Sequence, residues 1–204
     1  NDLIRIKKLS KKYNFKIIED ASHALGAKYK NSYIGNCKYS DVCVFSFHPV
    51  KSITTGEGGM ITTNSKKISS KLKLFRNHGI NRDKKFFLNK TKKINHYEQV
   101  ELGFNYRMND LEAALGISQL NRLKKFINKR IKIEKYYEDE LVNLPIQKPL
   151  FTKNSSWHLY VILLSNKNVR KKLFDFLRGK NINCQIHYIP IHTHPFYKKI
   201  GFKK

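Results

Sequence analysis

Short apolar runs that alternate with longer helical patterns constrain the fold of this chain most. Residues 15–19, 42–47 and 60–63 have the length and composition of buried strands, whereas residues 65–75 repeat their apolar side chains at helical spacing. Strands that alternate with helices are typical of a mainly parallel sheet. The chain has 204 residues, 40% of them hydrophobic, which is enough to bury a core. The sequence therefore predicts a globular α/β protein.

Polar residues follow the first two apolar runs directly. Asp20 ends the first run, and Ser46 and Lys51 lie at the end of the second and in the turn behind it, just before the glycine-rich residues 56–59. A lysine can bond covalently to the aldehyde of pyridoxal phosphate, and an acid can keep its ring nitrogen protonated. A hydroxyl group and backbone amides can hold its phosphate. This setting predicts a pyridoxal phosphate site with Lys51 as the catalytic residue.

Three assignments at this site stay open from the residues alone. Glu19 is a rival to Asp20, because adjacent residues of a strand face opposite ways and only one can face the cofactor. Asp20 could instead cap a following helix. His23 could donate a hydrogen bond to the cofactor or be an ordinary core histidine.

A long helix followed by a proline divides the chain in two. Asn109 and Glu112 form a capping-box pattern that opens a helical repeat, which continues to about residue 141 before Pro145. We therefore expect residues 1–143 to be part of a large domain and residues 144–204 to be part of a small C-terminal α/β domain. The remaining patterns predict a helix over 2–13, a surface loop over 84–99, a strand over 158–164, a helix over 169–178 and a strand over 183–188.

The formal charge of +26 is the main argument for a different class of protein, one that binds nucleic acid. The lysines, however, are scattered in pairs instead of forming one stripe with interleaved aromatics, and Lys, Asn and Ile are all abundant. We therefore expect no nucleic-acid partner, although a basic nucleic-acid-binding protein stays the alternative from another class. No run of 18 apolar residues occurs, so we expect no membrane insertion.

The cysteines and the C-terminal histidines predict neither disulfides nor a metal. Three cysteines without a C-x-x-C pattern fit a reducing cytoplasm. His187, His192 and His194 match no standard zinc spacing and lack cysteine or carboxylate neighbours. The chain begins without methionine, inside a helical pattern and with no signal-peptide features, so we expect a fragment of a longer protein.

Several motifs agree in order and spacing with one enzyme family. The segments EDASHALGA, FSFHPVKSITTGEGGMITTN, LFRNHGI, LGFNYRMNDLEAALGISQL and INCQIHYIPIH resemble the DegT/DnrJ/StrS-type nucleotide-sugar aminotransferases, which are pyridoxal phosphate enzymes of fold type I. The resemblance covers essentially the whole chain and is strongest to the pseudaminic-acid branch. It implies amination at C4 of a UDP-linked 4-keto-6-deoxy N-acetylhexosamine, with glutamate as the donor.

The resemblance implies a role for each polar residue of the site. Lys51 falls on the lysine that bonds to the cofactor, and Asp20 on the partner of the ring nitrogen. His23 falls near the cofactor's phenolic oxygen, and Ser46 on the phosphate. A dehydratase of the same family, in which histidine replaces the lysine, is an alternative that Lys51 argues against.

Two further positions extend the site beyond one large domain. Asn105 matches an asparagine that reaches the phosphate in the neighbouring subunit, which implies a homodimer with shared active sites; from the residues alone it could be a turn residue. His187 falls at the substrate mouth and is a candidate contact for the nucleotide-sugar. The resemblance also implies that the upstream third of the large domain and the end of the small domain lie outside this chain, so that its pocket is incomplete.

Overall fold

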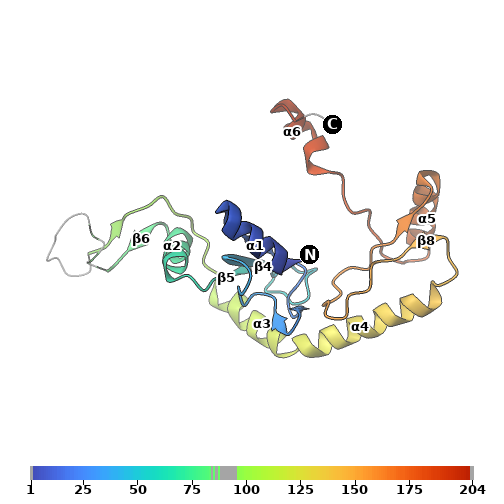
Figure 1. The fold of residues 1–204 in the computed structure, drawn as a ribbon, viewed down its shortest axis with the longest axis horizontal. Coiled ribbons are helices and arrows are strands. Elements are labelled where there is room, and N and C mark those ends of the chain that lie inside the picture. Colours follow the sequence, from blue (N-terminus) through green and yellow to red (C-terminus); the bar gives the residue numbers. More distant parts are fainter. Residues whose placement is uncertain (1, 84, 86, 88–95, 203–204) are drawn as a thin grey trace. The chain divides into compact units, whose positions relative to one another are not determined.

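The computed structural model describes residues 2–83, 85, 87 and 96–202, which divide into two compact units (Figure 1). The first comprises Asn1–Val142 with Leu150–Tyr160, and the second comprises Asn143–Pro149 with Val161–Lys204. Packing thus joins Leu150–Tyr160 to the first unit, although this segment follows the boundary expected at residue 143. The first unit contains α1 (Leu3–Tyr13), β1 (Ile18–Asp20), β2 (Lys28–Tyr29), β3 (Ser32–Tyr33), β4 (Val42–Ser46), β5 (Gly59–Thr62), α2 (Lys66–Arg76), β6 (Ile80–Asn81), β7 (Glu98–Gln99), α3 (Asp110–Asn121) and α4 (Leu123–Glu140). The second contains β8 (Ile146–Gln147), β9 (Leu163–Leu164), α5 (Lys167–Gly179), the 3-10 turn η2 (Ile191–Thr193) and α6 (Pro195–Lys199).

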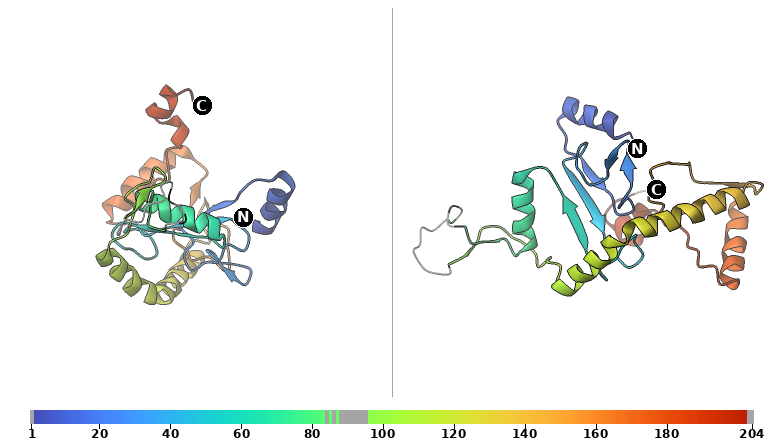
Figure 2. Two further views of the ribbon diagram at one scale, coloured as in Figure 1. Left: turned by 90° about the vertical axis from the view of Figure 1, so that its left-hand side faces the viewer. Right: turned by 90° about the horizontal axis from the view of Figure 1, so that it is seen from below.

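A three-stranded sheet in the order β1-β4-β5 positions the residues of interest. β1 and β4 are parallel, with Asp20 opposite Val44, whereas β4 and β5 are antiparallel, with Ser46 opposite Gly59. β5 departs from the parallel expectation because residues 47–58 form a loop, without the helix that a parallel crossover uses. Figure 2 shows β4 and β5 side by side, with α2 next to β5.

The core lies on one face of β4. Cys43, Phe45 and Phe47 alternate along this strand and are buried, as the period of two in a strand requires. Gly35 has φ +98°, and a Cβ there would lie 2.6 Å from the Phe45 ring, so the close packing requires glycine. The opposite face of β4 carries the half-buried Val42, Val44 and Ser46. The core cluster consists of Ala21, Cys37, Cys43, Phe45, Phe47 and Ile53.

The helices begin where their capping residues predict. The Asn109 side chain accepts a hydrogen bond from the Glu112 N–H (2.9 Å), and the Glu112 carboxylate accepts one from the Asn109 N–H (3.1 Å), so the predicted capping box is confirmed. The long helical stretch expected behind it forms two helices, α3 and α4, which meet at Arg122 with the bend visible in Figure 1. The helices predicted over 2–13, 65–75 and 169–178 are confirmed as α1, α2 and α5. In the described part of the chain, no helix is long and apolar enough to cross a membrane.

The strand predictions near the C-terminus are less accurate. The strand expected over 183–188 is wrong, because these residues are irregular and pair with no strand. Only Leu163–Leu164 of the strand expected over 158–164 forms, as β9 paired with β8. Most of the loop expected over 84–99 lies outside the described residues, and its end forms β7, which pairs with β6.

Candidate active site

Asp20 and Ser46 lie on the same face at the end of the sheet. Asp20 is opposite Val44 in the parallel register, and Ser46 follows Val44 by two residues, so the pleat puts both on one face. Glu19 is opposite Cys43, which is fully buried on the other face. The geometry therefore favours Asp20 over Glu19 as the acid of this site.

The Asp20 carboxylate is exposed and electrostatically stabilised. Its Oδ1 accepts hydrogen bonds from the Ser22 hydroxyl (2.5 Å) and the Ser22 backbone N–H (3.1 Å). These bonds, the hydroxyl first, lower the pKa of Asp20 below its ordinary value, and the charges of His23 and Lys51 add to the effect. Asp20 is therefore ionised at neutral pH.

Lys51 lies in the loop between β4 and β5, and hydrogen bonds join the two ends of this loop. The Lys51 N–H donates to the His48 carbonyl (2.9 Å). The loop is tied across its base, where the Phe47 N–H donates to the Gly58 carbonyl (2.9 Å) and the Thr55 N–H donates to the Phe47 carbonyl (3.0 Å). The structure therefore brings the half-buried Lys51 to the same edge of the sheet as Asp20 and Ser46.

Thr55 fixes the glycine turn behind Lys51. It is 3% exposed, and its hydroxyl donates to the Glu57 carbonyl. Gly58 has φ +144°, and a Cβ there would lie 2.5 Å from the Thr55 Oγ1, so only glycine fits. A Cβ at Gly116 of α3 would lie 2.8 Å from the Thr55 methyl group, so α3 also packs against the turn. Thr55 was not predicted from the sequence, although a threonine beside a glycine turn signals local hydrogen bonding.

Ser46 and His48 are linked at the start of the same loop. The Ser46 hydroxyl oxygen accepts a hydrogen bond from the His48 N–H at 3.4 Å. Ser46 is half-buried, whereas His48 is exposed. The Ser46 hydroxyl proton can therefore point away from the loop, toward an anion at the sheet edge.

His23 lies beside a histidine that the sequence analysis did not single out. The rings of His23 and His158 are 4.2 Å apart between centroids and tilted by 55°. The hydroxyl of Ser156, which is buried, donates to the His23 carbonyl (3.2 Å). Arg130 of α4 donates to the carbonyls of Trp157 (3.3 Å) and His158 (3.1 Å). These contacts hold His158 next to His23; the segment was missed because residues 158–164 have the pattern of a strand.

Asn105 lies in a turn anchored to the end of α2. It forms an isolated antiparallel bridge with Asn77. The carbonyl of Phe104 accepts a hydrogen bond from the His78 N–H (2.8 Å). Met108, three residues after Asn105, packs against the core cluster, and a Cβ at Gly58 would lie 2.9 Å from its methyl group. Met108 therefore links the turn that carries Asn105 to the loop that carries Lys51.

His187 belongs to the second unit. Its ring stacks on that of Tyr188, with centroids 4.0 Å apart and planes inclined by 29°. Its expected contact with a substrate stays a prediction. Across the described residues, no group of three or more His, Cys, Asp or Glu is arranged to hold a metal ion.

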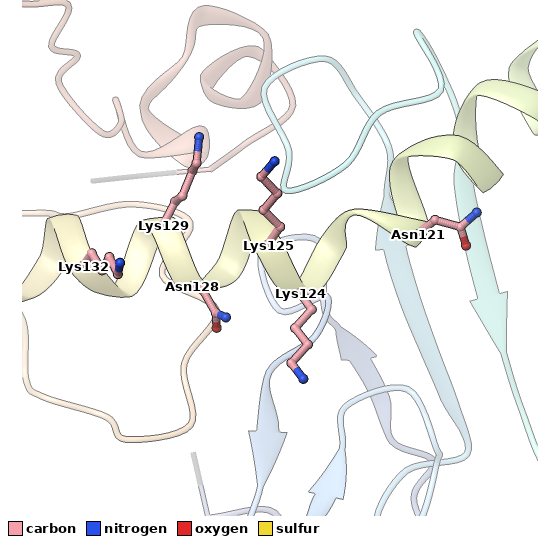
Figure 3. Close-up of a pocket in the computed structure, with 6 residues that line it drawn as sticks. All are labelled: Asn121, Lys124, Lys125, Asn128, Lys129 and Lys132. Atoms are coloured by element: carbon pink, nitrogen blue, oxygen red, sulfur yellow. The ribbon is translucent and has the colours of Figure 1, made fainter.

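Basic side chains occur on several separate helices, among them α1, α2, α4 and α5. Figure 3 shows a dense group along α4 and the end of α3, where Lys125 and Lys129 project to one side of the helix and Lys124 and Asn128 to the other. This group of side chains lines an open hollow on the surface, and none of the candidate site residues lies in it. The hollow is lined by Asn121, Lys124, Lys125, Asn128, Lys129 and Lys132.

Known proteins are similar to this chain in sequence. UDP-4-amino-4,6-dideoxy-N-acetyl-beta-L-altrosamine transaminase of Campylobacter jejuni is 41% identical over 204 residues, which cover 98% of this chain and 51% of that protein. An uncharacterized protein of Methanocaldococcus jannaschii is 40% identical over 212 residues, which cover 100% of this chain and 54% of that protein. The chain thus spans about half the length of the curated relatives it matches.

A solved structure extends the likeness to three dimensions. Helicobacter pylori PseC, an aminotransferase involved in the biosynthesis of pseudoaminic acid, superposes with a TM-score of 0.89 at 33% identity, covering 100% of this chain and 53% of that one. The fold is therefore that of part of such an aminotransferase. The model of the DegT/DnrJ/EryC1/StrS aminotransferase family matches residues 1–204. Since this match leaves no part of the chain unaccounted for, the chain belongs to the DegT/DnrJ/EryC1/StrS aminotransferase family.

Proposed function

We propose that the full-length protein is a pyridoxal phosphate-dependent nucleotide-sugar aminotransferase. Its substrate is a UDP-linked 4-keto-6-deoxy N-acetylhexosamine, which becomes the 4-amino sugar with glutamate as the donor. The observation that carries the proposal is that Asp20, whose pKa is lowered, and the loop that bears Lys51 lie at one edge of the sheet. The Campylobacter jejuni transaminase supports the class of substrate. A putative sugar aminotransferase of Streptococcus pneumoniae, solved in PLP and PMP forms with a TM-score of 0.84, supports the cofactor.

The residues at the sheet edge fit this cofactor. When bound, pyridoxal phosphate supplies an electron sink for the carbon that gains the amino group. The Lys51 amine would hold the cofactor and carry a proton between the reacting carbons. The exposed Asp20 carboxylate, with its lowered pKa, suits a partner for a protonated ring nitrogen. The Ser46 hydroxyl would contact the phosphate, and His23 would donate to the phenolic oxygen.

We further propose a cytoplasmic homodimer whose two active sites are shared. Asn105 is exposed in an anchored turn, where its amide is available to a phosphate of the partner subunit. His187 would contact the nucleotide-sugar from the small domain, which we assign to residues 144–204, while residues 1–143 belong to the large cofactor-binding domain.

Covalent trapping of the cofactor tests the central assignment. Full-length protein loaded with pyridoxal phosphate is reduced with borohydride, digested and analysed by mass spectrometry. We expect the label on the peptide that contains Lys51. Lys51→Ala should lose the label and at least about 10²–10⁴-fold in turnover, because both covalent attachment and proton transfer are lost. Lys66→Ala, an exposed lysine on α2, is the matched control and should keep both. A label on a different lysine would contradict the assignment.

Subunit mixing tests the shared site. Asn105→Ala removes one hydrogen bond to a charged group, worth about 1.5–3 kcal/mol, or about ten- to a hundredfold in cofactor affinity. In a hybrid of Lys51→Ala and Asn105→Ala subunits, one site carries both lesions and the other carries neither. Activity should therefore reappear, up to half the wild-type value per hybrid dimer. If hybrids form and no activity returns, Asn105 acts in its own subunit.

A further inference from the structure

The turn that presents Asn105 is held by backbone hydrogen bonds on both sides of that residue. The Phe104 N–H donates to the Phe75 carbonyl (2.7 Å), and the Phe104 carbonyl accepts from the His78 N–H (2.8 Å). On the other side, the Tyr106 N–H donates to the Arg76 carbonyl (3.0 Å). Residues 103–107, which we call the presenting turn, are therefore tied to residues 75–79 at the end of α2.

Two glycines let these backbones approach more closely than side chains would allow. A Cβ at Gly103 would lie 2.1 Å from the Gly79 nitrogen, and one at Gly79, which has φ +69°, would lie 1.7 Å from the Glu101 carbonyl oxygen. His78 itself adopts φ +58°, an uncommon conformation for a residue with a side chain. The glycines therefore allow the presenting turn to lie against residues 78–79 at a separation that side chains at these positions would prevent.

A side-chain pair completes this arrangement next to Asn105. The Arg107 Nη1 donates to the Asn77 Oδ1 at 2.6 Å. Asn77 is bridged directly to Asn105, so their side chains share one face of the two paired backbones. Arg107 follows Asn105 by two residues, and its guanidinium reaches back to Asn77, the bridge partner of Asn105. The hydrogen-bonded pair of Asn77 and Arg107 therefore adjoins Asn105.

We propose that Asn77 and Arg107 are positioning residues that orient the Asn105 amide for the cofactor phosphate. This inference rests on the proposed function. A charge-assisted hydrogen bond between two flanking side chains limits the rotamers open to Asn105, which lowers the entropy it loses when it binds an anion. The planar guanidinium of Arg107 suits this role because it holds a fixed direction. Arg107 acts through Asn105 and not by touching the phosphate.

A double-mutant cycle in the full-length protein tests the inference. Dissociation constants are measured for pyridoxal phosphate and for pyridoxal, which lacks the phosphate, in the wild type, Arg107→Ala, Asn105→Ala and the double variant. Arg107→Ala should weaken binding of pyridoxal phosphate by up to about tenfold, below the effect of Asn105→Ala, and leave pyridoxal binding unchanged. In the Asn105→Ala background it should have no further effect, because Arg107 acts through Asn105. Asn77→Ala should behave in the same way.

Two more variants separate orientation from loss of fold. Arg107→Lys keeps the charge and one donor but not the planar fork, so it should fall between wild type and Arg107→Ala. Arg5→Ala, an exposed arginine on α1, is the matched control and should bind both ligands as the wild type does. Melting temperatures and dimer content, measured for every variant, show that each is folded.

Several results would overturn the inference. If Arg107→Ala weakens phosphate-dependent binding equally with and without Asn105, Arg107 contacts the ligand itself. If affinity for both ligands falls together, the change loosens the fold in general. If Asn105→Ala weakens binding and Arg107→Ala does not, the positioning role fails and the proposed function stands. If borohydride leaves no label on Lys51, the proposed function fails instead.

Discussion

Gly103→Ala should loosen the presenting turn without altering any side chain of the candidate site. A Cβ at this position would lie 2.1 Å from the Gly79 nitrogen and 2.5 Å from the His78 carbonyl carbon. Both neighbours are backbone atoms, so no side-chain rotation can relieve the clash. The two backbones must move apart by about 1.3 Å or more to reach ordinary van der Waals contact.

The size of the effect follows from the hydrogen bonds that this movement disrupts. Three backbone hydrogen bonds, donated by Phe104, His78 and Tyr106, join the presenting turn to residues 75–79. Each contributes about 0.5–1.5 kcal/mol net, so we expect the local opening free energy to fall by about 2–4 kcal/mol. Amide protection in these segments should therefore fall by about 30- to 1,000-fold.

Hydrogen–deuterium exchange of the full-length protein measures this loss on peptides that cover 74–80 and 101–108. Gly179→Ala is the matched control, because a Cβ at that position of α5 meets nothing within 4 Å and alanine favours a helix. Its protection should equal or exceed that of the wild type. Wild-type protection at 74–80 and 101–108 in Gly103→Ala would refute the close-approach argument.

Other changes test the site and its supports. Ser22→Ala should raise the pKa of Asp20 toward its ordinary value, which NMR titration of the carboxyl would show. The ionised carboxylate stabilises the fold at higher pH, and this stabilisation is lost as the pH falls through the native pKa. In the variant the loss should therefore occur at a higher pH. Asn109→Ala should destabilise the first turn of α3 by about 1 kcal/mol, detected as faster exchange of its amides, and Asn109→Ser should recover most of it. Ile53→Ala, at 3% exposure behind Lys51, should cost about 2–5 kcal/mol and lower the melting temperature far more than Ile18→Ala, where the side chain is 69% exposed.

The local parts of the site could be predicted from the sequence. The strands that end next to Asp20 and Ser46 are signalled by neighbouring apolar residues. The first of them is less buried than its apolar run predicts, because in β1 Ile18 is exposed and only the preceding Ile17 is buried. The capping box at Asn109 is equally local. The choice between Asp20 and Glu19 needed the register with β4, which only the paired strands supply.

Long-range features could not be predicted in this way. Asn77 and Arg107 are 30 residues apart, and nothing in either segment indicates that the two side chains meet. The residues over 183–188 alternate like a strand, but alternation cannot show whether a partner strand exists, and in the described part none pairs with them. The break between α3 and α4 at Arg122 has no proline or glycine to announce it.

The antiparallel pairing of β4 and β5 has a consequence for how Lys51 can move. Ser46 and Gly59 are opposite each other in the ladder, so both ends of the lysine loop are fastened to the same pair of strands. An outward movement of this loop would break hydrogen bonds of the ladder and is therefore slow. Rotation about side-chain bonds, by contrast, takes picoseconds to nanoseconds. In the proposed function, the Lys51 amine would therefore move between the two reacting carbons by rotation about the bonds of its own four-carbon side chain. The backbone of the loop would stay in place while the Lys51 side chain rotates.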